Sequence, residues 1–256
     1  MKPSIKEHLT IFGCSLGLYI LNFLINRFIV KIIQSQTAII YISVLLIIIS
    51  FTVVTLVLYI RWAGLDTFRC KGIGYKIWLW SFLLCVSQWL FFCTLGGYPV
   101  WIENYYMSKE ITDYNYIIHI MYSFIGIFCI PVINAIIYRG LLQNQLSKFL
   151  APWLSISIIT TLIIILNLQK PVFLMPQVLF SAIIGGIIYY KTGKIILCIL
   201  YSSFFQLIWN TTRYSSDRSF SWLFLILAIT FTVFAIRGFM KEKVENKPLA
   251  ANQQIN

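Results

Sequence analysis

The stretch Ala38–Ile60 reads AIIYISVLLIIISFTVVTLVLYI and contains no charged residue. A helix of about 20 apolar residues is long enough to cross the hydrocarbon core of a bilayer. Similar apolar stretches fill most of the remaining chain, at Leu9–Val30, Ile77–Gly97, Tyr116–Leu142, Trp153–Leu168, Val172–Tyr190, Ile195–Trp209 and Phe220–Ile236. The sequence therefore predicts an all-α fold, a polytopic membrane helix bundle of about eight transmembrane helices.

The composition agrees with a membrane protein. Of 256 residues, 59% are hydrophobic and 11% are charged, against roughly a quarter charged in soluble domains. This balance excludes a soluble single domain and a disordered chain. The net charge of +12 falls between the apolar runs, which indicates the lipid bilayer as a partner and not nucleic acid. The six cysteines form no CxxC and no Cys/His cluster, so we expect no disulfide framework, no metal site and no cofactor.

Lysine and arginine are unevenly distributed between the expected loops. If the eight spans alternate, fourteen of these residues lie on the side of the N-terminus and six on the other side. The positive-inside rule then predicts a multi-pass protein of the cell membrane with both termini in the cytoplasm. We divide the chain into an N-terminal three-helix region with an outer loop (1–115), a membrane core (116–237) and a polar cytoplasmic tail (238–256).

One charged residue, Arg139, lies well inside an apolar stretch. Polar groups inside hydrocarbon are costly and are often functional, although an arginine near a helix end also marks the membrane interface. No Asp or Glu occurs between Tyr114 and Ser216. The last five expected spans therefore lack a carboxylate that could act as a general base or bind a metal, unless Asp113 or Asp217 folds back among them.

Prolines and small residues mark two other features of the second half. Pro131 and Pro176 lie inside expected spans and should kink or unwind them. The pairs Ser181/Gly185 and Ala182/Gly186 have small residues four positions apart, a spacing that favours close helix packing.

Two stretches carry a family resemblance. Pro131–Gln145 reads PVINAIIYRGLLQNQ, and Gly185–Gln206 reads GGIIYYKTGKIILCILYSSFFQ. In order and spacing they resemble the core motifs of the CPBP family, the CAAX proteases and bacteriocin-processing enzymes, also called the Abi or type II CAAX prenyl endopeptidase-like family. That family has about eight membrane helices, with its core in the second half. Its motifs are a proline, EExxxR followed by Gly, then FxxxH, a Tyr-x-x-Thr-Gly-like turn and a final HxxxN.

The resemblance assigns the family's site to six positions of this chain, which are Asn134, Ala135, Arg139, Asn167, Ser202 and Gln206. Arg139 and Gly140 match the Arg and Gly of the first motif, and Tyr138 stands at the preceding aromatic position. The two glutamate positions hold Asn134 and Ala135, and the FxxxH positions hold Ile163 and Asn167. The last motif falls on Ser202, with Ser203 as the alternative, and on Gln206.

These substitutions imply a lost activity. The family's chemistry needs a glutamate to activate water and histidines to bind a metal or stabilise an oxyanion. Asparagine, serine and glutamine form hydrogen bonds but do not exchange a proton near pH 7. We expect the polar residues to gather around Arg139, either as interhelical hydrogen bonds that only stabilise the bundle or as a binding cavity without hydrolytic activity.

Three interpretations of function follow. The first is a catalytically degenerate CPBP-like protein that acts in bacteriocin self-immunity or as a regulator, because members of the family accompany bacteriocin clusters or serve as scaffolds for cell-surface enzymes. Its partner would be a bacteriocin-like peptide or a membrane or cell-surface protein. The Ile- and Lys-rich composition is compatible with a Gram-positive bacterium.

The second interpretation is an active intramembrane endopeptidase of the CAAX-protease type with an atypical site, which would recruit Glu103, Asp113 or His119. The third is a small transporter or channel, which requires a continuous polar track across the bilayer. The sequence offers no acidic relay for such a track, so this interpretation ranks last.

Overall fold

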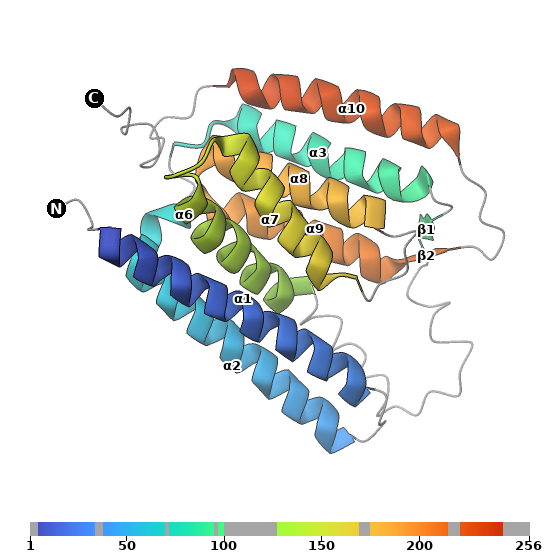
Figure 1. Cartoon of the computed structure of the whole chain (residues 1–256). Coiled ribbons are helices and arrows are strands. Elements are labelled where there is room, and N and C mark those ends of the chain that lie inside the picture. The colour runs from blue at the N-terminus through green and yellow to red at the C-terminus, as the bar shows by residue number, and fades with distance from the viewer. Residues whose placement is uncertain are drawn as a thin grey trace.

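The computed structural model describes residues 5–33, 38–69, 72–94, 97–99, 127–168, 175–214 and 221–242. The long helices and the short helical turns are α1 (Ile5–Ile33), α2 (Ala38–Ala63), η1 (Leu65–Thr67), α3 (Tyr75–Thr94), η2 (Ala135–Gln143), α6 (Asn144–Leu146), α7 (Pro152–Leu166), α8 (Met175–Thr192), α9 (Ile195–Thr211) and α10 (Trp222–Lys241). The prediction of an all-α helix bundle is confirmed (Figure 1).

Each expected span that the structure describes corresponds to a helix. In the described part of the chain, four helices are long and apolar enough to cross a membrane, at Leu46–Ala63, Tyr75–Thr94, Ile127–Leu146 and Trp222–Lys241. Shorter apolar helices cover Leu9–Ile25, Pro152–Leu166 and Ile195–Leu207. The chain is therefore a membrane protein by the length and composition of its helices, and the count of eight spans stays a prediction.

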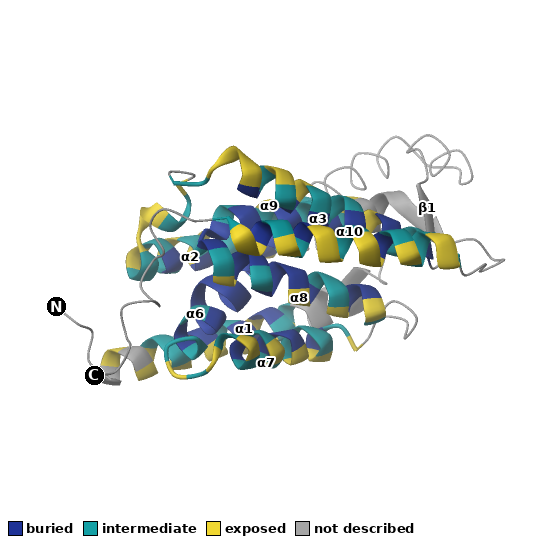
Figure 2. Cartoon of the chain, turned by 90° about the horizontal axis from the view of Figure 1, so that it is seen from above, coloured by how far each residue is buried: buried dark blue, intermediate teal, exposed yellow. Residues whose placement is uncertain are grey.

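The helix Ile127–Leu146, which contains η2 and α6, lies at the centre of the bundle. η2 contacts α1, α2, α7, α8 and α9. In the candidate span Ile127–Leu146, 61% of the residues are buried inside the bundle, whereas the buried share is 17% in Trp222–Lys241 of α10. Figure 2 shows the same contrast, with dark blue inside the bundle and yellow along α10. A helix surrounded in this way is apolar on all sides without facing lipid.

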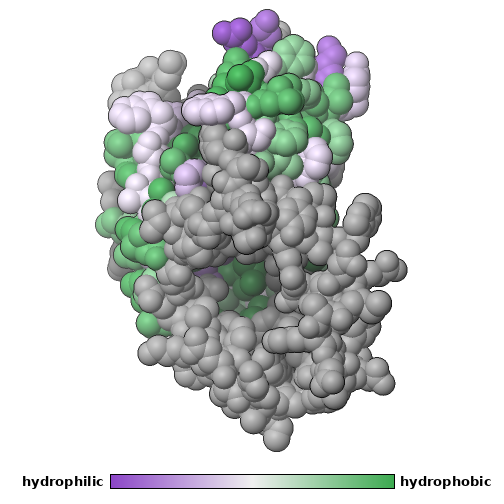
Figure 3. All heavy atoms as spheres, turned by 90° about the vertical axis from the view of Figure 1, so that its right-hand side faces the viewer, coloured by the Kyte–Doolittle hydropathy of each residue, from purple (hydrophilic) through white to green (hydrophobic). Residues whose placement is uncertain are grey.

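The outer helices present large apolar side chains to the surroundings. Leu46, Val53 and Val57 on α2 and Trp222 and Leu223 on α10 are all more than half exposed. The face seen in Figure 3 is mostly apolar among the described residues, with a few hydrophilic residues at its upper edge. In water such an apolar surface would promote association, whereas lipid tails solvate it.

α3 and α10 pack side by side on one edge of the bundle, opposite α1 and α2 (Figure 1). Gly238 of α10 lies directly against the ring of Trp80, so that a Cβ atom at this position would overlap the indole. Phe239 is fully buried in the core. Because this packing continues α10 to Lys241, the first residues of the predicted tail 238–256 belong to the helix; those after Glu242 lie outside the described residues.

Lysine side chains link helix ends and a helical turn at one end of the bundle. Lys191 Nζ donates to the Met240 carbonyl at 2.7 Å, and Lys194 Nζ donates to the Asp66 carbonyl at 3.1 Å. Arg69 also pairs with Asp66 at 3.1 Å. α1 begins and α10 ends on the same side of the bundle (Figure 1). At the other end, β1 (Gly97–Pro99) pairs antiparallel with β2 (Thr212–Tyr214) and so links α3 to α9.

The two predicted prolines lie in different parts of the described helices. Pro176 is the second described residue of α8, and the residues before Met175 lie outside the described part of the chain, so its effect on a span stays a prediction. Pro131 lies within Ile127–Leu146 as expected, but the departure from α-helical geometry lies further on, in the π-helical segment η2.

Candidate functional site

Arg139 lies in the middle of η2, at the centre of the bundle. η2 is a nine-residue π-helix, and all nine of its residues are buried. π-helical turns are rare and are frequent at functional sites. The side chain of Arg139 is only 5% exposed. The arginine is therefore an interior residue of the bundle, and the alternative that it lies at the level of the membrane interface stays a prediction.

The guanidinium of Arg139 binds two neutral acceptors. Its Nη1 donates to Gln143 Oε1 at 2.9 Å, and its Nη2 donates to the backbone carbonyl of Ala182 in α8. Gln143 Nε2 donates in turn to the Gly186 carbonyl at 3.0 Å. Since a helix carbonyl has a second lone pair, these bonds add to the helical ones. Arg139 and Gln143 together fasten η2 to one face of α8.

Two glycines on that face make room for the guanidinium. A Cβ atom on Gly185 would lie 3.5 Å from Arg139 Nη2, which is ordinary contact. A Cβ atom on Gly186 would lie 3.0 Å from Arg139 Nη1 and 2.9 Å from Ile156 Cγ2 of α7. The small residues predicted for close helix packing therefore have a more specific role, because they admit a charged side chain between η2 and α8.

A third glycine, Gly140, lies on the side of η2 that packs against α2. A Cβ atom on Gly140 would overlap the ring of Tyr59, a fully buried residue of α2. Glycine at this position therefore allows the backbone of η2 to lie directly against an aromatic ring. Tyr59 packs edge-on against Phe68, with ring centroids 5.5 Å apart.

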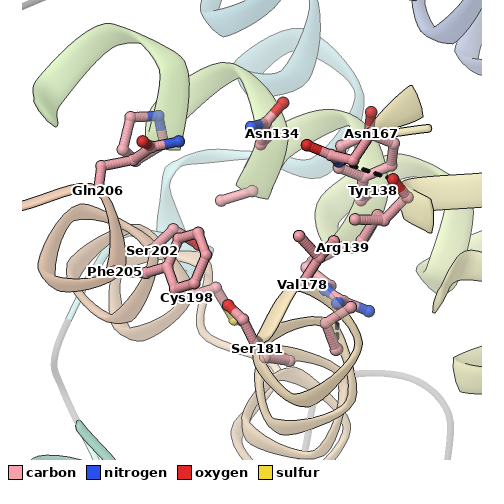
Figure 4. Close-up of a pocket in the computed structure, with 15 residues that line it drawn as sticks. Asn134, Tyr138, Arg139, Asn167, Val178, Ser181, Cys198, Ser202, Phe205 and Gln206 are labelled. Atoms are coloured by element: carbon pink, nitrogen blue, oxygen red, sulfur yellow. Dashed lines mark hydrogen bonds between the residues drawn. The ribbon is translucent and has the colours of Figure 1, made fainter. Parts of the chain in front are cut away.

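A cavity of about 90 Å³ opens beside Arg139, between the helix Ile127–Leu146, the end of α7, α8 and α9 (Figure 4). The structure brings all six positions of the resemblance to its wall: Asn134, Ala135, Arg139, Asn167, Ser202 and Gln206. The remaining lining residues are Pro131, Tyr138, Ile163, Val178, Ser181, Ala182, Gly185, Cys198 and Phe205. Of the two serines considered for the last motif, Ser202 lines the cavity and Ser203 is not among its lining residues.

Several of the polar side chains around the cavity are held by hydrogen bonds, some of them between helices. Asn22 Nδ2 of α1 donates to Asn134 Oδ1 at 3.4 Å and to the Tyr138 hydroxyl at 3.5 Å. Asn167 Nδ2 donates to the Ile163 carbonyl at 2.7 Å, at the end of α7. Among the described residues, no hydrogen bond joins Arg139 to Asn134, Asn167, Ser202 or Gln206. The expected polar cluster therefore shares a cavity with Arg139 without binding it directly.

Sequence reasoning missed two residues that shape the site. Gln143 lies one helical turn after Arg139, and an arginine followed by an amide four residues later is a spacing that could have indicated the pair. Asn22 lies 112 residues before its partner Asn134. A polar residue in an apolar helix suggests a partner on another helix, but nothing in the sequence says which one.

The chemistry of the wall is that of neutral hydrogen-bonding groups and one guanidinium. Among the described residues, the lining contains no carboxylate and no imidazole. Within the described ranges, no three His, Cys, Asp or Glu side chains come together in a way that could hold a metal ion. Glu103, Asp113 and His119, which an atypical peptidase site would recruit, lie outside the described residues. The described residues of the wall can donate and accept hydrogen bonds, and none of them is an acid or a histidine of the kind that takes a proton from water near pH 7.

Comparison with known proteins confirms the resemblance. Residues 116–212 match a family model described as type II CAAX prenyl endopeptidase Rce1-like. This range contains every residue that lines the cavity. No curated protein and no solved structure matches the chain. The chain is thus similar, over most of its second half, to intramembrane proteases of the CPBP type.

Proposed function

We propose that the protein is a catalytically degenerate CPBP-like membrane protein that binds a peptide in this cavity without cleaving it. Its role is bacteriocin self-immunity or the regulation of a membrane or cell-surface partner. The supporting observation is that six motif positions line one cavity, and that the described residues of its wall include no acid and no imidazole. A site that keeps its shape and loses its proton-transfer groups can still bind, because binding needs only a complementary wall.

The wall suits an apolar peptide with a few polar groups. Asn134, Asn167 and Gln206 offer amides that can donate to and accept from a peptide backbone. Pro131, Val178 and Phe205 supply apolar contact. Concave sites that combine an apolar wall with a few placed polar groups are typical of ligand binding.

An immunity assay tests the proposal. The protein is expressed in a strain that is sensitive to the cognate bacteriocin peptide, and the minimal inhibitory concentration is measured. We expect a rise of tenfold or more for the wild type. Ser202→Phe fills part of the cavity from α9 and should abolish the protection. Leu200→Phe makes an equally bulky change at a residue of α9 that is 48% exposed, and it should leave the protection intact.

A cleavage assay separates binding from hydrolysis. The purified chain is incubated with the same peptide and with a prenylated peptide, and the products are followed by mass spectrometry. We expect no turnover by the wild type. Turnover that Arg139→Ala and Asn134→Ala both abolish would overturn the proposal and establish an active endopeptidase. Unchanged sensitivity of the expressing strain would remove the immunity role.

A further inference from the structure

The charged side chains that the structure describes, apart from Arg139, lie at one end of the bundle. At this end α2, α8 and α10 stop and α3 and α9 begin, and α1 also begins there (Figure 1). The described cations of this end are Arg61, Arg69, Lys76, Lys148, Lys191, Lys194, Arg237 and Lys241, and the described acids are Glu7, Asp66 and Glu242. Among the described side chains, eight cations therefore face three acids, an excess of five positive charges.

Most of these cations have partners within the protein. Arg69 pairs with Asp66, and Lys76 pairs with Glu242. The other partners are backbone carbonyls for Lys191 and Lys194 and a side-chain amide for Lys148. Arg61, Arg237 and Lys241 have no ion pair or hydrogen bond with another described residue. Two of these three, Arg237 and Lys241, lie on the same helix, α10.

Arg237 lies on the side of α10 that faces away from the bundle. Ala235 and Phe239 are fully buried and mark the inner side of the helix. At 3.6 residues per turn, Arg237 lies roughly 160–200° around the helix axis from them. Its side chain is exposed, as is the outer side of α10 in Figure 2. Because α10 is long and apolar enough to cross a membrane, lipid surrounds this side of the helix.

The position of Arg237 along α10 places its charge at the level of lipid headgroups. Arg237 lies four residues before Lys241, the last residue of the helix, which corresponds to about 6 Å along the axis. A long arginine side chain reaches the interface from this depth while its methylene groups stay in the apolar region. Residues four apart are neighbours on the surface of a helix. Arg237 and Lys241 therefore present two positive charges to the same part of the interface.

We propose that Arg237 and Lys241 form a binding site for the phosphate group of an anionic phospholipid, whose acyl chains lie along the outer side of α10. A guanidinium binds a phosphate through two parallel N–H donors. Val233, Phe234 and Met240 are exposed on α10 beside the two cations, and they give the acyl chains an apolar surface. The inference is independent of the proposed function, because α10 contributes no residue to the lining of the cavity.

The net charge of this end favours an anionic lipid over a zwitterionic one. A phosphatidylcholine headgroup brings a cation of its own into a region with an excess of positive charge. A phosphatidylglycerol headgroup brings only the phosphate, and cations near a membrane surface attract such lipids. A soluble acidic peptide suits the place less well, since Phe234 is 60% exposed beside Arg237 and an apolar surface of this kind is solvated by lipid tails.

The test compares two lipids on the full chain. The protein is purified in dodecyl maltoside and titrated with dioleoyl phosphatidylglycerol or dioleoyl phosphatidylcholine, which have the same acyl chains. Native mass spectrometry measures the dissociation constant of the first lipid bound. We expect phosphatidylglycerol to bind at least tenfold more tightly than phosphatidylcholine.

Two double variants distinguish a local site from the overall charge of this end. The variant Arg237→Gln with Lys241→Gln should weaken the binding of phosphatidylglycerol by about fivefold or more and leave that of phosphatidylcholine unchanged. The control, Arg61→Gln with Arg69→Gln, removes the same charge near the end of α2 and should change the affinity less than about twofold. A third variant, Arg237→Lys with Lys241→Arg, keeps both charges and should retain the preference.

The variants leave the packing of α10 intact, because Gly238 and Phe239 make its contacts with the bundle. Thermal unfolding in the same detergent checks that each variant is folded. Equal binding of the two lipids would overturn the inference. An equal loss in both glutamine variants would also overturn it, because the preference would then come from the charge of the whole end. Displacement of the lipid by millimolar inorganic phosphate would assign the site to a free anion and would equally overturn the inference.

Discussion

A single methyl group tests whether α8 is shaped around Arg139. Gly185 and Gly186 are neighbours inside the same helix, so an alanine at either position should gain about 0.5–1 kcal/mol of helix stability. Only at Gly186 does the new Cβ atom come within 3.0 Å of Arg139 Nη1 and 2.9 Å of Ile156 Cγ2. The difference between the two variants therefore isolates the steric term.

Neither neighbour of Gly186 can move away cheaply. Ile156 is β-branched and stiff at its first torsion angle, and Arg139 Nη1 is bound to Gln143 at 2.9 Å. Overpacking of this kind costs about 1–3 kcal/mol. We expect Gly186→Ala to lower the free energy of unfolding by that amount relative to Gly185→Ala. Gly185→Ala itself should be neutral or stabilising, because its nearest contact is 3.5 Å.

The assay is thermal and denaturant unfolding in detergent micelles, followed by circular dichroism, with the two variants and the wild type measured side by side. A double variant, Gly186→Ala with Ile156→Ala, should recover part of the loss. If the two single variants unfold within about 0.5 kcal/mol of each other, Arg139 and Ile156 do not define this surface of α8 as described. The packing argument would then be wrong.

Three more results are expected. Gln143→Leu removes the acceptor for Arg139 and the donor to the Gly186 carbonyl, so the free energy of unfolding should fall by about 1–3 kcal/mol. An equally large fall for Asn144→Leu on the same helix would contradict the role of Gln143 in linking η2 to α8. Gly140→Ala should destabilise through the ring of Tyr59, and a double-mutant cycle with Tyr59→Leu should give a coupling energy of about 0.5–3 kcal/mol; strictly additive losses would refute the contact. Partial burial lowers the pKa of Lys148 below its ordinary value, so the folded state binds this proton less well than the unfolded state, and stability should rise with pH from the folded pKa to the unfolded pKa. Lys148→Met should abolish this rise in alkaline denaturation curves, and an unchanged curve would count against the desolvation.

The sequence predicts the helices well because each apolar run must form its own backbone hydrogen bonds in lipid. The boundaries of α9 and α10 differ from the expected spans by a few residues. These ends depend on packing between helices, as at the buried Phe239 near the end of α10. The hydropathy of the chain does not show this packing.

The candidate site was predictable as a set of positions and not as a set of contacts. The motif spacing identifies Asn134, Asn167 and Ser202, and all three line the cavity. It does not identify the acceptor of Arg139, because a backbone carbonyl such as that of Ala182 carries no mark in the sequence. The π-helical course of η2 is also absent from the apolar pattern, which reads as an ordinary helix.

The contact between Asn22 and Asn134 has a consequence for biosynthesis. The two asparagines are separated by 112 residues, and a ribosome adds about 5–20 residues per second. The ribosome therefore adds Asn134 roughly 6–22 s after it has added Asn22. During this interval the side chain of Asn22 needs another hydrogen-bond partner, such as water at the insertion channel, a lipid headgroup or an insertase. The contact between the first helix and the central helix forms only after the central helix has been synthesised.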